Sequence, residues 1–243
     1  EYVARILIDL GIQVSESTVC RSLKYIRQTW KKKTRSAYRK HTNANLQRTA
    51  DFLVWQGERD GSKIIYADEM GVRAENAERR FARSTAGTKA VKPGASAQTG
   101  ERGTKHNFLG ALSTTHGMLD ISFPVVGKVD HRIFEEWCEI MLIPEMLEVF
   151  PLGGASVIMD NASFHRRLVL EEMFNAAGIE LKFLPAYSPE YNPIETAFAW
   201  VKARIRQNPT ESIRNIPLAT TRAFQAITGD LATSWAKHSG YRL

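Results

Sequence analysis

Two aspartates each end a short apolar run, a position at which a carboxylate is poorly solvated. Asp68 ends the run IIYAD (64–68), and Asp160 ends the run VIMD (157–160). Each run has the length and composition of a buried strand, so its terminal carboxylate needs hydrogen-bond donors or a cation. One such acid is commonly a helix cap or a ligand of backbone amides. Two on adjacent strands would repel each other, which favours a divalent cation between them.

A third acid follows a proline-rich turn in the segment LPAYSPEYNPIE (184–195). Pro193 suits the first turn of a helix, and Asn192 suits the N-cap before it. Glu195 then falls in the first turn, where the helix N-terminus favours an anion. The alternative is that Glu195 only complements the helix dipole. Glu190 is a rival third acid, but it lies in the loop before the cap and is less rigidly aimed.

The residue types also indicate which cation these acids would bind. The chain has two cysteines and six histidines, and they form no cluster with the spacing of a zinc site. The remaining ligands are carboxylate oxygens, which prefer Mg²⁺ or Mn²⁺. We therefore expect Asp68, Asp160 and Glu195 to be both catalytic residues and metal ligands.

The elements that position these acids follow from the apolar periodicity. Strands are predicted at 63–68, 107–113, 118–126, 155–160 and 180–184, with a hairpin turn at 115–117. Helices are predicted at 46–56, 132–150, 165–177 and 193–207, with at least one more before the end of the chain. Three strands in a meander, then helices alternating with short parallel strands, describe an α/β mixed sheet with flanking helices. Chemistry gathers at the carboxyl ends of strands in such sheets.

The first thirty residues have the pattern of two helices around a turn. Apolar residues repeat at helical spacing over 2–10, Gly11 ends the pattern, and the segment SEST (15–18) offers an N-cap for a second helix. This is the layout of a helix-turn-helix, whose second helix lies in the major groove of DNA. The side chains predicted to contact DNA from its open face are Ser17, Thr18, Arg21 and Lys24.

Two basic segments are further candidates for DNA contacts. From Val19 to Ala50 the chain has ten Lys or Arg and no Asp or Glu, a composition that attracts a polyanion. The candidate residues in this basic linker and the helix after it (31–60) are Lys31, Lys32, Lys33, Arg35, Arg39 and Lys40. A second segment adds Arg79, Arg80, Lys89 and Lys92 as possible phosphate ligands. The alternative for both segments is a solvated surface that binds nothing.

The totals fit one large domain preceded by a small one. The chain has 243 residues, a net charge of +7 and 43% hydrophobic residues, which are ordinary values for a soluble globular protein. No apolar run approaches the ~18 residues of a membrane span, and no signal peptide is recognisable. Two isolated cysteines fit a reducing compartment. Because the chain begins at Glu1 without a methionine, we expect residues to be missing before it.

The segments around the three acids resemble the mariner superfamily of DDE transposases, including the related bacterial insertion-sequence transposases. The matching segments are YADE (66–69), MDNASFH (159–165) and YSPEYNPIE (187–195). Thirty-four residues lie between Asp160 and Glu195, a separation typical of one large branch of that superfamily. The resemblance spans residues 63–207, and the helix-turn-helix with its basic linker extends it to nearly the whole chain. Trp200 falls later than in some branches, which leaves the sub-family open.

The resemblance implies an RNase H-like catalytic domain (61–243) behind the helix-turn-helix (1–30). It implies a transposase that acts on double-stranded DNA as a homodimer, in the nucleus of a eukaryote or the cytoplasm of a bacterium. Water first frees a 3′-OH at the transposon end, and that 3′-OH then attacks target DNA at a TA step. In-line attack on a phosphodiester suits two Mg²⁺ or Mn²⁺ ions about 3.5–4 Å apart. We expect Asp68 to bridge them, Asp160 to help anchor them and Glu195 to complete one coordination sphere.

Three further residues have supporting roles in this hypothesis. Asn161 and His165 would orient Asp160 or the scissile phosphate, although a capping Asn and a structural His are equal alternatives. Asn192 would begin the helix that carries Glu195. Glu69 is set aside, because it would point to the opposite face of the sheet if the strand continued past Asp68.

Two other classes of protein share part of this pattern. Another RNase H-like nuclease or integrase would have the acids, but it is not expected to have the NPIE turn at this spacing. A domesticated DNA-binding protein derived from a transposase would lack catalysis, and its sign would be a lost acid. All three acids are present here, which weakens the second alternative.

Overall fold

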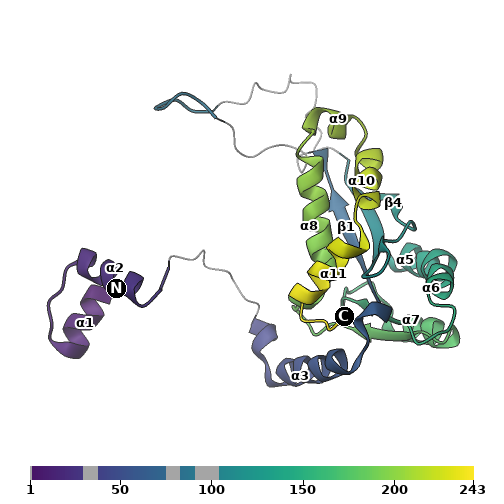
Figure 1. Ribbon diagram of the computed structural model, residues 1–243, viewed down its shortest axis with the longest axis horizontal. Helices are drawn as coiled ribbons and strands as arrows, with labels where there is room; N and C mark the ends of the chain where they lie inside the picture. The colour runs from purple at the N-terminus through teal and green to yellow at the C-terminus, as the bar shows by residue number, and fades with distance from the viewer. Residues whose placement is uncertain (1, 30–37, 75–82, 91–103) are drawn as a thin grey trace. The chain divides into compact units, whose positions relative to one another are not determined.

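The computed structural model describes residues 2–29, 38–74, 83–90 and 104–243 (Figure 1). The chain divides into two compact units, Glu1–Ala37 and Tyr38–Leu243. The first unit is helical, and the second contains the sheet. Within the described ranges, no helix is both long enough and apolar enough to cross a membrane.

The first unit is a pair of short helices, α1 (Tyr2–Leu10) and α2 (Glu16–Tyr25). Gly11 ends α1 with a φ of +66°, a conformation that glycine adopts without strain. The Oγ of Ser15 accepts a hydrogen bond from the backbone N of Thr18 at 3.2 Å and so caps α2. The two predicted helices and the turn between them are therefore confirmed. No residue of either helix is buried.

The second unit is built on one mixed sheet. Its strands are β1 (Ile64–Val72), β2 (His106–Ser113), β3 (Gly117–Met118), β4 (Phe123–Val126), β5 (Ser156–Met159) and β6 (Glu180–Phe183). Their order is β3-β2-β1-β5-β6, and β4 also pairs with β2. β1 runs antiparallel to β2 and parallel to β5, which is parallel to β6. The predicted mixed sheet is confirmed, and β1 and β5 lie at its centre.

Two strands differ from their predicted bounds. β1 continues past Asp68 to Val72, because its antiparallel pairing with β2 continues that far. The predicted strand at 118–126 is divided into β3 and β4. The backbone N of Leu119 still donates to the carbonyl of Ala111 on β2 at 2.9 Å, but the chain then leaves the ladder until Phe123. Leu119 and Ile121 are both buried in the core, so this apolar run does not form one continuous strand.

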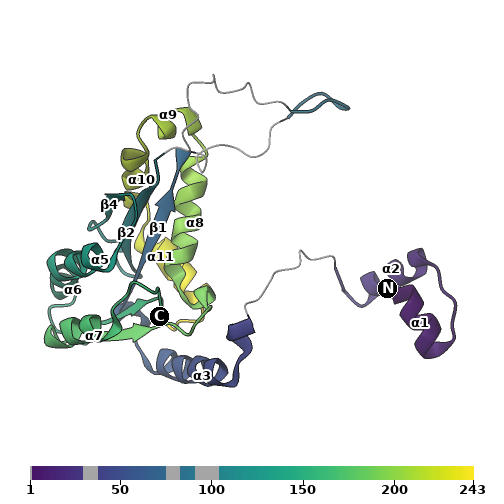
Figure 2. The same ribbon diagram turned by 180° about the vertical axis from the view of Figure 1, so that it is seen from behind.

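Helices cover both faces of the sheet (Figures 1 and 2). After the helix α3 (Asn43–Glu58), they are α5 (His131–Trp137), α6 (Ile143–Val149), α7 (Arg167–Ala176), α8 (Pro193–Ile205), α9 (Pro209–Arg214), α10 (Ile216–Gln225) and α11 (Gly229–His238). Short 3-10 turns lie at Tyr38–His41, Gly61–Lys63 and Pro189–Tyr191. One core contains side chains of α3, α8, α10 and α11, and the other contains side chains of α5, α6 and α7. The expected α/β architecture is confirmed.

The helix predicted at 132–150 contains a π-helical turn, Cys138–Leu142, between α5 and α6. The backbone N of Ile143 donates to the carbonyl of Cys138, five residues earlier. Pro144 follows directly and has no N–H, so a regular α-helix would lose a hydrogen bond there. The π turn accommodates this proline without ending the helix.

Helix α3 belongs to the second unit and is longer than predicted, because its first and last turns are polar and carry no apolar signal. Phe52 and Trp55 are buried in the core. Glu180 on β6 accepts hydrogen bonds from Trp55 Nε1 at 2.8 Å and from the guanidinium of Arg59 at 2.9 and 3.1 Å. These contacts fix α3 against the edge of the sheet.

Candidate active site

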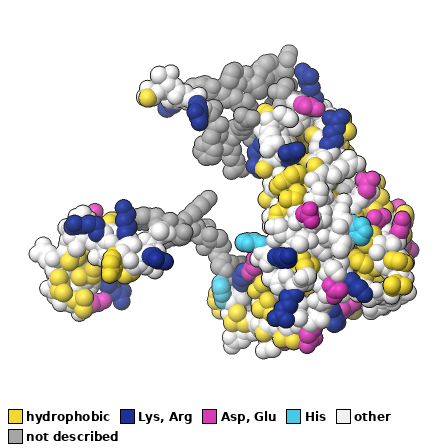
Figure 3. Space-filling view, in the orientation of Figure 1, with side chains coloured by type: hydrophobic (Ala, Val, Ile, Leu, Met, Phe, Trp, Pro, Cys, Tyr) yellow, Lys and Arg dark blue, Asp and Glu magenta, His cyan; other side chains and the backbone are white. Residues whose placement is uncertain are grey.

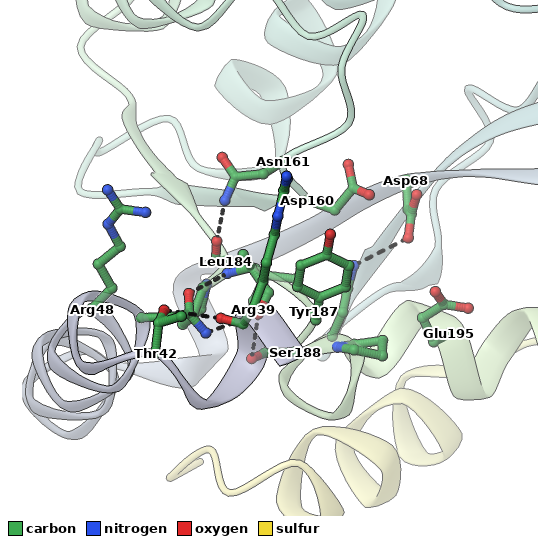
Figure 4. Close-up of a pocket in the computed structure, with 15 residues that line it drawn as sticks. Arg39, Thr42, Arg48, Asp68, Asp160, Asn161, Leu184, Tyr187, Ser188 and Glu195 are labelled. Carbon is green, nitrogen blue, oxygen red and sulfur yellow. Dashed lines mark hydrogen bonds between the residues drawn. The ribbon is translucent and has the colours of Figure 1, made fainter. Parts of the chain in front are cut away.

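The register of the sheet places the first two acids side by side. Tyr66 on β1 is opposite Ile158 on β5, and both side chains lie in the same core. Asp68 and Asp160 each follow that pair by two residues, and side chains two residues apart share a face of a strand. Figure 4 shows both carboxylates at the same pocket.

Asp68 is a buried acid, with 8% of its surface exposed. Its Oδ1 accepts a hydrogen bond from the backbone N of Glu69 at 2.7 Å, and its Oδ2 accepts one from Asn192 Nδ2 at 3.3 Å. Burial raises the pKa of Asp68 well above its usual range, and the charges of Asp160 and Glu195 raise it further. A bound cation would offset both effects.

Asp160 lies in a tight turn just after β5. Its Oδ1 accepts a hydrogen bond from the backbone N of Ala162 at 3.0 Å and lies 3.3 Å from His165 Nδ1. The side chain is 46% exposed, so the turn orients the carboxylate while leaving it accessible from the pocket.

Glu195 lies in the first turn of α8, as predicted. Asn192 occupies the N-cap position, but its side chain makes no capping hydrogen bond and contacts Asp68 instead. The expected capping role of Asn192 is therefore corrected, because its amide group holds the first acid. Glu195 is exposed at the mouth of the pocket, but partial desolvation of its carboxyl still raises its pKa, against the opposing charge of Lys202.

The rival third acid, Glu190, has a different environment. Its carboxylate forms an ion pair with Lys40, and both side chains are partly exposed. Glu195 lines the pocket of the two aspartates, whereas Glu190 is absent from the described residues around it. The geometry favours Glu195 as the third acid.

The three acids line one pocket of about 580 Å³. Within the described residues, no group of three or more His, Cys, Asp or Glu is arranged so that it could hold a metal ion. The three acids line one pocket, but they do not form a ready-made metal site in this structure. Their oxygen donors and the raised pKa of Asp68 nevertheless fit a hard divalent cation.

Asn161 and His165 support the turn that holds Asp160. Asn161 Nδ2 donates to the backbone carbonyl of Leu184, at the end of β6. His165 Nδ1 lies 3.0 Å from the backbone carbonyl of Asp160, and because a carbonyl only accepts, this nitrogen carries the proton. Burial lowers the pKa of His165, which is consistent with a neutral ring.

Helix α5 packs behind this turn. The ring of His165 lies against Phe134, with centroids 4.1 Å apart. Next to it, the Arg166 guanidinium donates to the buried carboxylate of Glu135, with Nε at 2.7 Å from Oε1. These contacts tie the residues after Asp160 to a core helix and limit the movement of the second acid.

We expect His165→Phe to lower the cleavage rate, or raise the Mg²⁺ concentration needed, by about 10- to 100-fold. Phenylalanine keeps the ring contact with Phe134 but removes the donor to Asp160. His165→Asn replaces that donor and should recover part of the loss. DNA binding serves as the control and should not change. Wild-type rates in both variants would show that His165 only fills the core.

Glu69 lies on the opposite face of the sheet, as expected. It is paired with Leu109, which belongs to the other core. Burial raises the pKa of Glu69 to about 7, with Asp160 adding to the effect and Lys105 opposing it. Glu69 is therefore not placed with the three acids.

Among the predicted DNA contacts that the structure describes, Arg39 lines this pocket. Arg21 and Lys24 are exposed on α2, where Figure 3 shows Lys and Arg at the surface of the first unit. Ser17 and Thr18 each contact the hydroxyl of Ser15 at 2.9 Å, so both take part in capping α2. The predicted contacts outside the described residues are Lys31, Lys32, Lys33, Arg35, Arg79, Arg80 and Lys92.

The side of the pocket formed by α3 was not predicted from the sequence. Thr42, Asn45 and Arg48 line it, and their spacing of three places them on one side of the chain at the start of a helix. That spacing was the available signal. Thr42 and Asn45 were assigned to the linker and Arg48 to the helix predicted at 46–56, so the three were not recognised as one face. Arg39 lines the same side of the pocket.

Comparison with known proteins identifies the family. Residues 63–216 match the family described as DDE superfamily endonuclease. This chain belongs to that family, which confirms the DDE enzyme expected from the three acids. No curated protein sequence matches the chain.

The fold is shared with solved structures of Mos1 mariner transposase. The Mos1 paired-end complex with the left transposon end has a TM-score of 0.66 at 16% identity, covering 99% of this chain and 78% of that one. The Mos1 paired-end complex with Mn has 0.68 at 14%, covering 98% and 75%. The Mos1 strand transfer complex has 0.68 at 13%, covering 97% and 73%. At these identities the likeness establishes a common fold.

Proposed function

We propose that this protein is a cut-and-paste DNA transposase whose active site is the pocket of Asp68, Asp160 and Glu195. The observation that carries the proposal is that three motif acids line one pocket: Asp68 on β1, Asp160 just after β5 and Glu195 in the first turn of α8. Membership of the DDE endonuclease family supports it. So does the fold shared with Mos1, whose structures include a strand transfer complex.

Two Mg²⁺ or Mn²⁺ ions held by these acids would activate the attacking water and stabilise charge on the entering and leaving oxygens. Asp68, the most buried of the acids, would hold the ions together with Asp160 and Glu195. Asn192 holds one oxygen of Asp68, and His165 fixes the turn of Asp160, so both act by positioning ligands.

The partners proposed for this chemistry are the terminal repeats of a transposon and a target duplex, cut at TA. Two ends must be joined to one target, so we propose a homodimer on DNA. Arg21 and Lys24 on α2 are the described residues proposed to contact the duplex of the repeat. An exposed pair of basic side chains on a second helix fits the major groove and its phosphates.

The proposal is tested by incubating the protein with duplex DNA that carries the repeats flanking its gene, with Mg²⁺, Mn²⁺ or EDTA. A transposase yields nicks with a free 3′-OH at the repeat ends, followed by joining to target DNA. Cleavage without joining would instead show a nuclease. Firm binding to the repeats with no cleavage in either metal would show a DNA-binding protein that has lost catalysis.

A further inference from the structure

Tyr187 has a backbone conformation that a bulky residue rarely adopts. Its φ is +58°, and among the described residues only Arg27 is another non-glycine residue with positive φ. Such a conformation is strained and persists only where the surroundings impose it, often at functional sites. Tyr187 lines the pocket of the three acids.

Contacts on both sides of Tyr187 impose this conformation. Asn45 on α3 bonds both backbone groups of Ala186, at 3.1 Å in each case. Ser188 is buried, and its Oγ donates to the carbonyl of Ala186 at 3.3 Å. The side chain of Tyr187 itself is not packed away, because the residue is 51% exposed. The loop is thus held in a strained form that presents an aromatic ring to the pocket.

Two arginines line the same pocket and have no carboxylate partner in the part of the chain that the structure describes. Within the described residues, Arg39 and Arg48 form no ion pair, whereas Arg59, Arg166 and Arg167 each pair with a glutamate. Arg39 and Arg48 come from the segment around the start of α3, which Glu180 and Asn45 fix to the sheet. In Figure 4 the ring of Tyr187 stands between Arg39 and Asp68.

This combination of side chains fits a nucleotide of a single strand. A guanidinium binds a phosphate through parallel hydrogen bonds, and an aromatic ring stacks on any base that is not already stacked within a duplex. A pocket of about 580 Å³ is large enough for a nucleotide, whereas a double helix can only lie across its mouth. The acids in the same pocket place the phosphodiester that is cut next to this nucleotide.

We propose that Tyr187, Arg39 and Arg48 bind an unpaired nucleotide and its phosphates beside the bond that the three acids cleave. The proposal rests on the proposed function, because it takes DNA to be the substrate of the acids. It assigns to Tyr187 the contact with the base, and to the arginines the contacts with the backbone of that strand.

The test is equilibrium binding in EDTA, so that it requires no catalysis and can succeed even if the protein cuts nothing. Two fluorescent duplexes of the terminal repeat are compared, one fully paired and one with three unpaired nucleotides at the cleavage end. Tyr187→Gly should bind the unpaired end about 5- to 100-fold more weakly than wild type. It should bind the paired duplex within about twofold of wild type. Tyr187→Phe keeps the ring and should bind both as wild type does.

Glycine is chosen at position 187 because it adopts positive φ without strain, so this variant should melt no lower than wild type. Arg39→Gln should weaken binding of the unpaired end and reduce the slope of log K against log salt by about 0.7. Arg167→Gln is the matched control, because Arg167 pairs with Glu171 on α7 outside the pocket. Arg167→Gln should change neither the affinity for the unpaired end nor the salt dependence of binding.

Removing the bases tests the assigned contact directly. When the three unpaired nucleotides are abasic, wild type should bind this DNA as weakly as Tyr187→Gly binds the unpaired end with its bases. Removing the bases should not weaken the binding of Tyr187→Gly any further. If Tyr187→Gly binds the unpaired end as wild type does, the proposal is wrong. The proposal is also wrong if Tyr187→Gly loses the same factor of affinity for paired, unpaired and abasic DNA, because the ring would then act only through the structure of the loop.

Discussion

Replacing Glu195 by glutamine is expected to lower the rate of metal-dependent DNA cleavage by at least about 100-fold, whereas Glu190→Gln should stay within a few-fold of wild type. Glutamine keeps the size of the side chain but removes the charge with which a carboxylate binds a divalent cation. Losing one ligand of a catalytic ion removes several kcal/mol of transition-state stabilisation, and each 1.36 kcal/mol is about tenfold in rate. Glu190 loses only a partly exposed ion pair with Lys40, which is worth about 1 kcal/mol or less.

The two glutamates are a matched pair, because they lie five positions apart in one motif. The measurement is single-turnover cleavage of repeat-end DNA with Mg²⁺, with DNA binding as the control for folding. Loss of cleavage in Glu190→Gln with activity kept in Glu195→Gln would reverse the assignment of the third acid.

Asp68→Asn is expected to abolish cleavage while raising the melting temperature of the metal-free protein by a few degrees. Burial and the neighbouring acids raise the pKa of Asp68, so its folded-state pKa lies above the unfolded value of about 4. Any stability that the neutral carboxyl contributes is present below that unfolded value and is lost as pH rises through the folded pKa. Asparagine cannot ionise and avoids this loss. For a domain of this size, about 1 kcal/mol corresponds to about 2–4 °C.

Thermal melts at pH 5, 7 and 8, with EDTA or Mg²⁺, measure this effect. In EDTA, the melting temperature of Asp68→Asn should exceed that of wild type by an amount that grows with pH. Mg²⁺ should raise the melting temperature of wild type more than that of the variant. Asp120→Asn, at an exposed position, is the control and should show neither trend. A variant that melts below wild type at every pH in EDTA would contradict the electrostatic account of this acid.

The acids could be predicted from the sequence because their positions depend on local patterns. An apolar run that ends in an acid specifies a strand terminus, and Asn192-Pro193 specifies the start of α8. These signals lie within a few residues of the acids that they position. The parallel pairing of β1 with β5 then brings Asp68 and Asp160 together.

The remainder of the pocket depends on contacts between residues far apart in the chain. Asn45 bonds to Ala186, 141 positions away, and Lys40 pairs with Glu190, 150 positions away. No local pattern reports such contacts, so the helix was predicted only at 46–56 and the residues at the start of α3 were assigned to the linker. The side chain of Asn192 was assigned to capping for the same reason, since its contact with Asp68 spans 124 positions.

The positive φ of Tyr187 shows the limit of turn signals. The surrounding YSP and NP segments predict a turn, but they predict no strained tyrosine within it. The conformation follows from the bonds of Asn45 and Ser188 to Ala186, and only the folded structure reveals them.

The central claim is that this one pocket cuts DNA with metal ions held by its three acids. It is tested most directly by comparing wild type with Asp160→Asn on repeat-end DNA in Mg²⁺ or Mn²⁺, with binding measured on the same DNA. The account predicts metal-dependent nicking at the repeat ends by wild type and none by the variant, with equal affinity for the DNA. Nicking by Asp160→Asn at the wild-type rate would contradict it.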